Sequence, residues 1–110
     1  MNIQLKLTNE SLTTITSLLY PIYNTKAVER REKRMLSLCL DVVNKLDSKF
    51  RSIKVKTDLF SLKHRVTINL KFHEADALEL LLLQEIKNVT NKDVARITQK
   101  VIDELNQKLA

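Results

Sequence analysis

Two stretches of the chain alternate between apolar and polar residues, and this period of two predicts β-strands. Residues 2–7 place Ile3, Leu5 and Leu7 on one side, and residues 66–72 repeat the alternation. One face of each strand is therefore expected to be buried, while the other presents polar side chains to solvent.

After each strand the apolar residues change to helical spacing. We expect a first helix capped by Thr8 and a long second helix over residues 26–50. A third helix is expected over residues 74–87, and Thr90 or Asn91 is expected to cap a fourth. Leucines at positions 80–83 surround most of the third helix, which predicts that it is buried centrally.

Glycine is absent, and Pro21 is the only proline. Pro21 is expected to end the first helix near its last turn. Phosphate-binding loops, dinucleotide-binding fingerprints and nucleophile elbows all need glycine, so these classes of site are excluded. Left-handed turn positions would then fall to asparagine, and Asn24 and Asn88 stand where helices should end.

The order of strand, helix, turn and helix occurs twice, which predicts an internal repeat. A shift of 65 residues superimposes Ile3, Leu5 and Lys6 on identical residues of the second stretch. We expect one α+β domain over residues 1–110, mostly helical with a small antiparallel sheet. Two tandem β-α-α units, 2–50 and 65–109, would be related by pseudo-twofold symmetry. The connector 51–64 could hold a short strand at 53–55 and a loop or one helical turn at 58–63.

The formal net charge of +6 is unevenly distributed. Residues 26–71 carry thirteen basic and five acidic side chains, a balance of +8, whereas residues 72–110 carry five and seven, a balance of −2. The basic middle favours an anionic partner, either DNA or an acidic protein. The alternative is a solvated surface that only keeps the protein soluble.

Cys39 is the single cysteine and lies within an apolar stretch, so it is expected to be a small buried residue. A lone cysteine fits a reducing, cytoplasmic setting. No apolar run approaches the length of a membrane span, and the N-terminus does not resemble a secretory signal. We therefore expect no membrane partner.

No catalytic signature is present. His73, Glu74 and Asp76 are the nearest approach to a metal site, but this spacing does not place them on one helix face. We therefore expect neither an enzyme nor a cofactor.

The repeated unit resembles the ribbon-helix-helix family of DNA-binding proteins. Apolar residues five, eight, eleven and twelve positions after Leu7 match the first helix of that family. Asn88, Val89 and Thr90 stand where the family often has glycine, an apolar residue and a helix-capping Ser or Thr. The resemblance implies that two strands pair into an antiparallel ribbon that enters the major groove of DNA.

In that arrangement the outward strand residues would contact bases, because amide side chains suit adenine and lysine suits guanine. The candidate base contacts are Gln4, Lys6, Thr67, Asn69 and Lys71. Basic residues near the starts of the second and fourth helices would contact phosphates. These candidates are Lys26, Arg30, Arg31, Lys33, Arg34 and Lys92.

Two functions follow from the sequence. The first is a non-enzymatic interaction or assembly module that forms a homo-oligomer, because the leucine clusters at 36–43 and 80–83 exceed what one small core needs. The alternative is a ribbon-helix-helix-like regulator that reads the major groove with paired strands 2–7 and 66–72.

Overall fold

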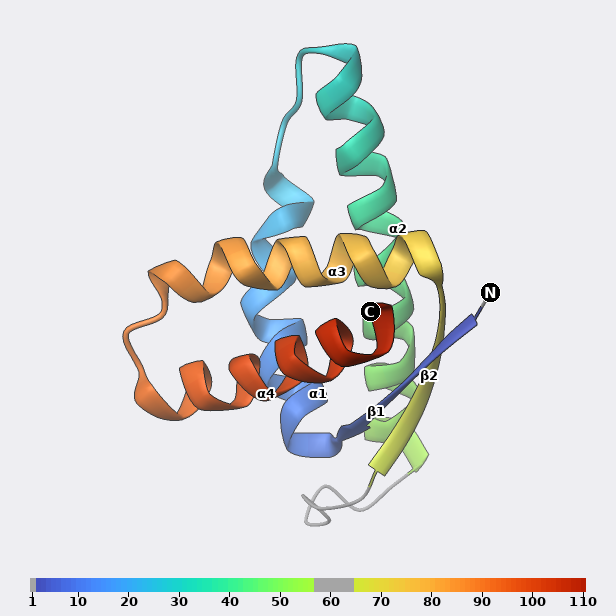
Figure 1. The fold of residues 1–110 in the computed structure, drawn as a ribbon, viewed down its shortest axis with the longest axis vertical. Coiled ribbons are helices and arrows are strands. Elements are labelled where there is room, and N and C mark those ends of the chain that lie inside the picture. Colours follow the sequence, from blue (N-terminus) through green and yellow to red (C-terminus); the bar gives the residue numbers. More distant parts are fainter. Residues whose placement is uncertain (1, 57–64) are drawn as a thin grey trace.

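The computed structural model of the protein describes residues 2–56 and 65–110 (Figure 1). In chain order the elements are β1 Asn2–Thr8, α1 Asn9–Leu19, η1 Tyr20–Asn24, α2 Arg30–Lys56, β2 Arg65–Lys71, α3 Phe72–Glu85, η2 Ile86–Asn88 and α4 Lys92–Leu109, where η marks a 3-10 helix. The predicted α+β class is confirmed: the described chain is mostly helical and has a small antiparallel sheet.

The sheet consists of β1 and β2, which pair antiparallel over their full length. Leu5 lies opposite Ile68, and both are buried together with the other odd-numbered residues of β1 and even-numbered residues of β2. The alternation predicted from the sequence is confirmed, since each strand buries every second side chain.

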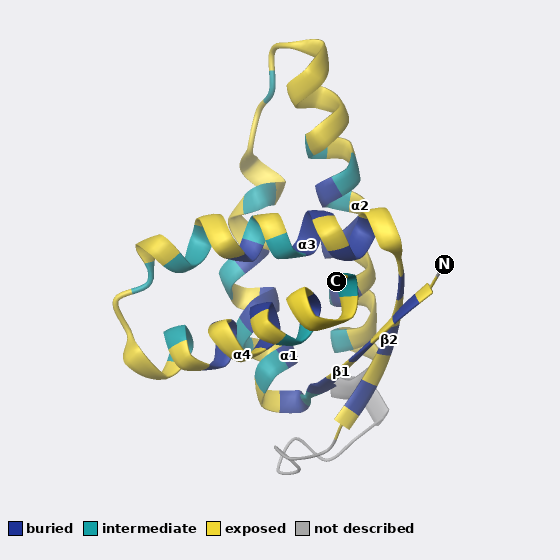
Figure 2. Ribbon diagram, in the orientation of Figure 1, coloured by how far each residue is buried: buried dark blue, intermediate teal, exposed yellow. Residues whose placement is uncertain are grey.

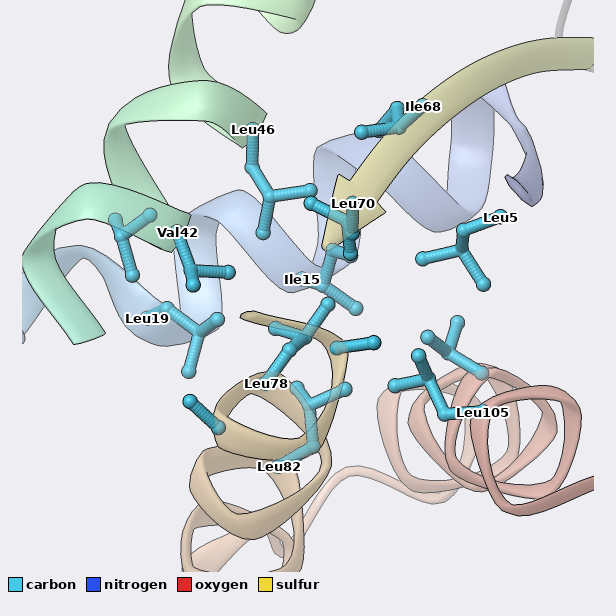
Figure 3. Packing of buried hydrophobic residues seen from close by; sticks show 14 of the residues in the cluster. Leu5, Ile15, Leu19, Val42, Leu46, Ile68, Leu70, Leu78, Leu82 and Leu105 are labelled. Carbon is cyan, nitrogen blue, oxygen red and sulfur yellow. The ribbon is translucent and has the colours of Figure 1, made fainter. Parts of the chain in front are cut away.

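The core lies between the inner face of the sheet and the four α-helices (Figure 3). Leu5 and Leu70 of the strands meet side chains from every α-helix, which Figure 3 shows converging on one centre. The labelled helical members are Ile15, Leu19, Val42, Leu46, Leu78, Leu82 and Leu105. Burial of about ten such side chains, each contributing roughly 1.5–3 kcal/mol, is the main force that fixes the sheet on the helices.

Helix ends largely follow the sequence expectations. Thr8 Oγ1 accepts a hydrogen bond from Ser11 N at 3.1 Å and caps α1, while Asn91 Oδ1 accepts bonds from the first turn of α4. α1 ends at Leu19, and Pro21 lies in η1, where its missing N–H costs no helical hydrogen bond.

The expectation of left-handed asparagines is wrong. No described residue has a positive φ. The chain instead leaves α1 and α3 through 3-10 turns, in which Thr25 N donates to Ile22 O at 3.0 Å and Val89 N donates to Ile86 O at 3.2 Å. A 3-10 turn tightens the helix end without a left-handed residue, so no glycine is needed.

Both ends of α2 differ from the prediction. α2 spans residues 30–56 instead of 26–50, so the strand expected at 53–55 is absent and the helix covers the start of the connector. Nothing in residues 51–56 interrupts a helix, because they contain neither glycine nor proline. The loop or turn expected at 58–63 lies outside the described residues.

The second strand is displaced by one residue from its predicted position at 66–72, since β2 runs from Arg65 to Lys71. β2 ends at Lys71, and Phe72 is the first residue of α3. The Glu74 carboxylate accepts a hydrogen bond from the backbone N–H of Lys71 at 2.8 Å. This bond satisfies an N–H at the helix start and turns the chain out of the sheet.

The prediction that α3 is buried on all sides is also wrong, because one face of the helix is exposed. Figure 2 shows exposed residues along this helix, and among them Leu80 and Leu83 are 42% and 39% exposed. The buried side consists of Ala75, Ala77, Leu78 and Leu82. The helix therefore carries apolar residues that no described part of the chain covers.

Candidate nucleic-acid interface

The outer face of the β1–β2 sheet is polar and open to solvent. Along β1 it presents Asn2, Gln4 and Lys6, and along β2 it presents Arg65, Thr67, Asn69 and Lys71, all of them exposed. The five candidate base contacts therefore lie together on one surface, because both strands turn their apolar residues to the core.

The register of the pairing fixes how these side chains are ordered. Gln4 lies opposite Asn69, Lys6 opposite Thr67, and Lys71 opposite Asn2. Two amides thus occupy the centre, and the two lysines lie diagonally on either side of them. Four residues separate the Lys6 and Lys71 positions along the sheet, or about 13 Å at the usual rise of a strand.

The free edge of β1 is covered by α4. Glu104 Oε1 accepts a hydrogen bond from Lys6 N at 3.4 Å, and Lys108 Nζ donates to the carbonyl oxygen of Gln4. Lys108 Nζ also forms an ion pair with Glu104 Oε1 at 3.8 Å, across one turn of α4. These contacts occupy backbone groups that would otherwise attract another strand, so the sheet presents its face rather than its edge.

A basic groove of about 400 Å³ runs between β1 and α4. Four cationic residues line it, Lys6 and Arg65 from the strands and Arg96 and Lys100 from α4. Two carboxylates, Glu10 and Glu104, line it as well. The groove keeps an excess of two positive charges beside the outer face of the sheet.

A second groove, of about 370 Å³, lies along the opposite edge of the sheet, between β2 and α2. Thr67 and Asn69 line it from the strand, and Lys45, Ser48, Lys49 and Ser52 line it from the helix. Cationic side chains therefore flank the outer face on both sides.

Glu74 holds the end of β2 against α2. It is 5% exposed, and its Oε1 lies 2.7 Å from Lys45 Nζ in addition to the bond from Lys71 N. Burial alone would raise the pKa of Glu74. The hydrogen bonds from Lys45 and Lys71 and the charge of Lys45 outweigh burial and hold the pKa below its ordinary value. The ionised carboxylate thus fixes the exit of β2, where Lys71 lies.

The structure does not bring the six candidate phosphate contacts to the sheet. All six are exposed, but the first turn of α2, with Arg30, Arg31, Lys33 and Arg34, lies at the opposite end of the molecule from the sheet (Figure 1). Lys92 starts α4 at a further corner, and Lys26 lines an apolar groove beside α2.

Four cationic residues that flank the sheet are not among the candidates chosen from the sequence: Lys45, Lys49, Arg96 and Lys100. A signal was present, since each pair is spaced four residues apart and so shares one helix face. Tertiary packing decides which strand each helix lies beside, and the spacing of residues along a helix does not predict this.

The other chemically reactive groups do not form a second site among the described residues. Cys39 is buried, and burial raises the pKa of its thiol. In residues 2–56 and 65–110 no three His, Cys, Asp or Glu side chains come together in a way that could hold a metal ion. Within the same residues, none of the helices combines the length and apolarity that a membrane crossing requires.

No protein-family model matches the chain, and no curated protein or solved structure gives a significant match.

Proposed function

We propose that this protein binds double-stranded DNA and places the outer face of its β1–β2 sheet in the major groove. The observation that carries the proposal is an uncovered antiparallel two-stranded sheet whose exposed residues are asparagine, glutamine, threonine, lysine and arginine. A two-stranded ribbon fits the width of the major groove of B-DNA, about 12 Å, and this set of side chains can bond to base edges there.

The pairing register supports the tandem arrangement of two β-α-α units. The shift of 65 residues that relates the two strand sequences turns Gln4 into Asn69, and these two residues lie opposite each other. A pseudo-twofold axis would therefore pass between them. In the ribbon-helix-helix family, which the chain resembles, two separate subunits meet about such an axis, whereas here one chain would supply both units.

This arrangement specifies the kind of DNA site. Gln4 and Asn69 suit adenine at the centre, and Lys6 and Lys71 suit guanine on either side, about four base pairs apart at roughly 3.4 Å per pair. The preferred site would be close to palindromic. Because glutamine and asparagine differ in length, its two halves would be similar rather than identical.

The flanking lysines and arginines provide the phosphate contacts in this proposal. A ribbon in the major groove has one sugar-phosphate backbone on each side. Lys45 and Lys49 line the groove beside β2, and Arg96 and Lys100 line the groove beside β1. Such contacts position the protein without reading sequence, and they make binding depend steeply on salt.

Selection of bound duplexes from a random pool, followed by fluorescence anisotropy titration, tests the proposal. We expect an enriched, nearly palindromic site and an affinity that falls as salt is raised. The variant Asn69→Ala/Lys71→Ala should lose the preference for that site while its circular dichroism spectrum stays unchanged. Double-stranded RNA is the control ligand, because its deep, narrow major groove does not admit a ribbon. Absence of duplex binding at low salt would refute the proposal.

A further inference from the structure

One face of α3 combines exposed apolar residues with carboxylates. Phe72, Asp76, Glu79, Leu80 and Leu83 follow a spacing of four, three, one and three residues, which places them on one side of the helix. Phe72, Asp76, Leu80 and Leu83 are exposed, and Glu79 is half-buried. We call these five residues the α3 face.

The α3 face is acidic. From Phe72 to Glu85 the helix carries four carboxylates and no lysine or arginine. Glu74 is already paired with Lys45, but Glu79 is not: its Oε2 is shielded from solvent and has no hydrogen-bond partner among the described residues. A shielded carboxylate oxygen without a donor is costly, so a cation from outside the described chain would stabilise it.

The N-terminal part of α2 has the opposite charge. Met35 continues the apolar stripe that buries Cys39 and Val42, but it is itself exposed, and Val28 just before the helix is 85% exposed. Figure 2 shows this end of α2 as exposed and projecting from the body. The α2 tip, as we define it, comprises Val28, Arg30, Arg31, Arg34 and Met35.

An apolar groove of about 460 Å³ lies beside the tip. Met35, Leu36 and Cys39 of α2 line it, together with Leu18 of α1, Ile22 of η1 and Leu81 of α3. Three charged residues, Lys26, Glu32 and Glu85, line it as well. At about 100° per residue, Leu81 lies on the opposite side of α3 from Phe72 and Leu83, so the groove and the α3 face lie on opposite sides of this helix. A contact between the α3 face of one copy and the groove of another is therefore head-to-tail, and each copy can take part in two such contacts.

We propose that the protein self-associates, with the α3 face of one copy packing on the α2 tip and groove of a second copy. Leu80 and Leu83 would enter the groove, while Arg31 and Arg34 would meet Asp76 and Glu79. The charges argue against contact between two tips, since both are basic, and against contact between two α3 faces, since both are acidic. This association is independent of DNA binding, because none of the ten residues lies on the sheet.

Charge reversal in two separate variants tests the contact. Asp76→Lys/Glu79→Lys makes the α3 face basic, and Arg31→Glu/Arg34→Glu makes the tip acidic. Each variant alone would place like charges opposite each other, so we expect sedimentation velocity to show association at least about tenfold weaker than that of the unaltered protein. An equimolar mixture of the two should associate again, because every contact between unlike variants pairs opposite charges.

The matched control for the first variant is Asp41→Lys/Asp103→Lys, which raises the net charge as much as Asp76→Lys/Glu79→Lys does, at exposed positions outside the contact. It should associate as the unaltered protein does. Leu80→Ser/Leu83→Ser should weaken association without changing the circular dichroism spectrum. A monomer at every accessible concentration of the unaltered protein, or a mixture of the two reversed variants that stays monomeric, would overturn the proposal.

Discussion

Gln4 of β1 lies directly opposite Asn69 of β2 at the centre of the two-stranded sheet. The carbonyl oxygen of Gln4 accepts its hydrogen bond from Lys108, so the backbone polar groups of Gln4 point away from β2. In this kind of antiparallel pair the two Cα atoms are about 4.5 Å apart and the side chains are closest. The two amides therefore form one central feature of the outer face.

Removing both amides should reduce sequence discrimination. A bidentate amide contact to adenine contributes about 1–3 kcal/mol of discrimination, so Gln4→Ala/Asn69→Ala should lower the preference for the selected duplex about tenfold or more. Stability should change by less than about 0.5 kcal/mol, because both side chains are exposed. Competition between the selected and a scrambled duplex, followed by anisotropy, measures the effect. Gln84→Ala/Asn88→Ala removes two amides away from the sheet and should leave discrimination unchanged.

The flanking lysines should set the salt dependence of binding. Each phosphate contact contributes about 0.9 to the slope of log K against log salt, so Lys49→Gln/Lys100→Gln should lower that slope by about 2 for every duplex alike. Lys33→Gln/Lys92→Gln removes the same charge from the starts of α2 and α4. If the second variant flattened the slope and the first did not, the phosphate contacts would lie at the helix starts, as the sequence first suggested.

Glu74 should make stability depend on pH in the acid range. Its pKa is lower in the folded protein than in the unfolded chain, so its contribution is present above the unfolded value and is lost as pH falls through the folded value. Glu74→Gln should cost about 1.5–3 kcal/mol at neutral pH, because a buried charge-assisted bond is lost. Urea unfolding at neutral and acid pH should show the cost shrinking as the medium becomes more acid. Glu29→Gln, at an exposed site, should cost far less.

Tyr23 should titrate at unusually high pH. Burial, the hydrogen bond to Asp47 and the charge of Asp47 raise its pKa to about 12. Because the folded pKa exceeds the unfolded value, the contribution of Tyr23 to stability is present below pH 10 and is lost as pH rises toward 12. Ultraviolet absorbance titration should show one phenol that ionises near pH 12, and Tyr23→Phe should remove this ionisation. A titration of the unaltered protein that is complete near pH 10 would contradict the assignment.

Several features of the fold follow directly from short-range patterns. The alternation in both strands specified which side chains face outward, because successive strand residues point to opposite faces. Thr8 and Asn91 could be identified as caps for a similar reason, since capping depends on residues only two or three positions away. The candidate base contacts could therefore be chosen correctly as exposed residues before any fold was known.

The location of the candidate phosphate contacts relative to the sheet could not be predicted from local sequence patterns. A basic cluster at positions 30–34 is conspicuous along the chain, yet the fold carries it away from the sheet (Figure 1). Lys49 and Lys100 stand in ordinary amphipathic helices, and only the packing of α2 on β2 and α4 on β1 places them beside the outer face.

Pairwise contacts between distant residues were also decided by tertiary structure alone. Gln4 meets Asn69, and Lys45 meets Glu74, through packing of elements far apart in sequence. The exposure of Leu80 and Leu83 belongs to the same class, because a helix surrounded by leucines does not specify which side finds a partner. The sequence by itself determined the type of each element and the inward or outward direction of its side chains, which depend on local periodicity. Tertiary structure alone decided which elements lie against each face, because burial of the core between distant segments fixes the register of the sheet and the position of each helix.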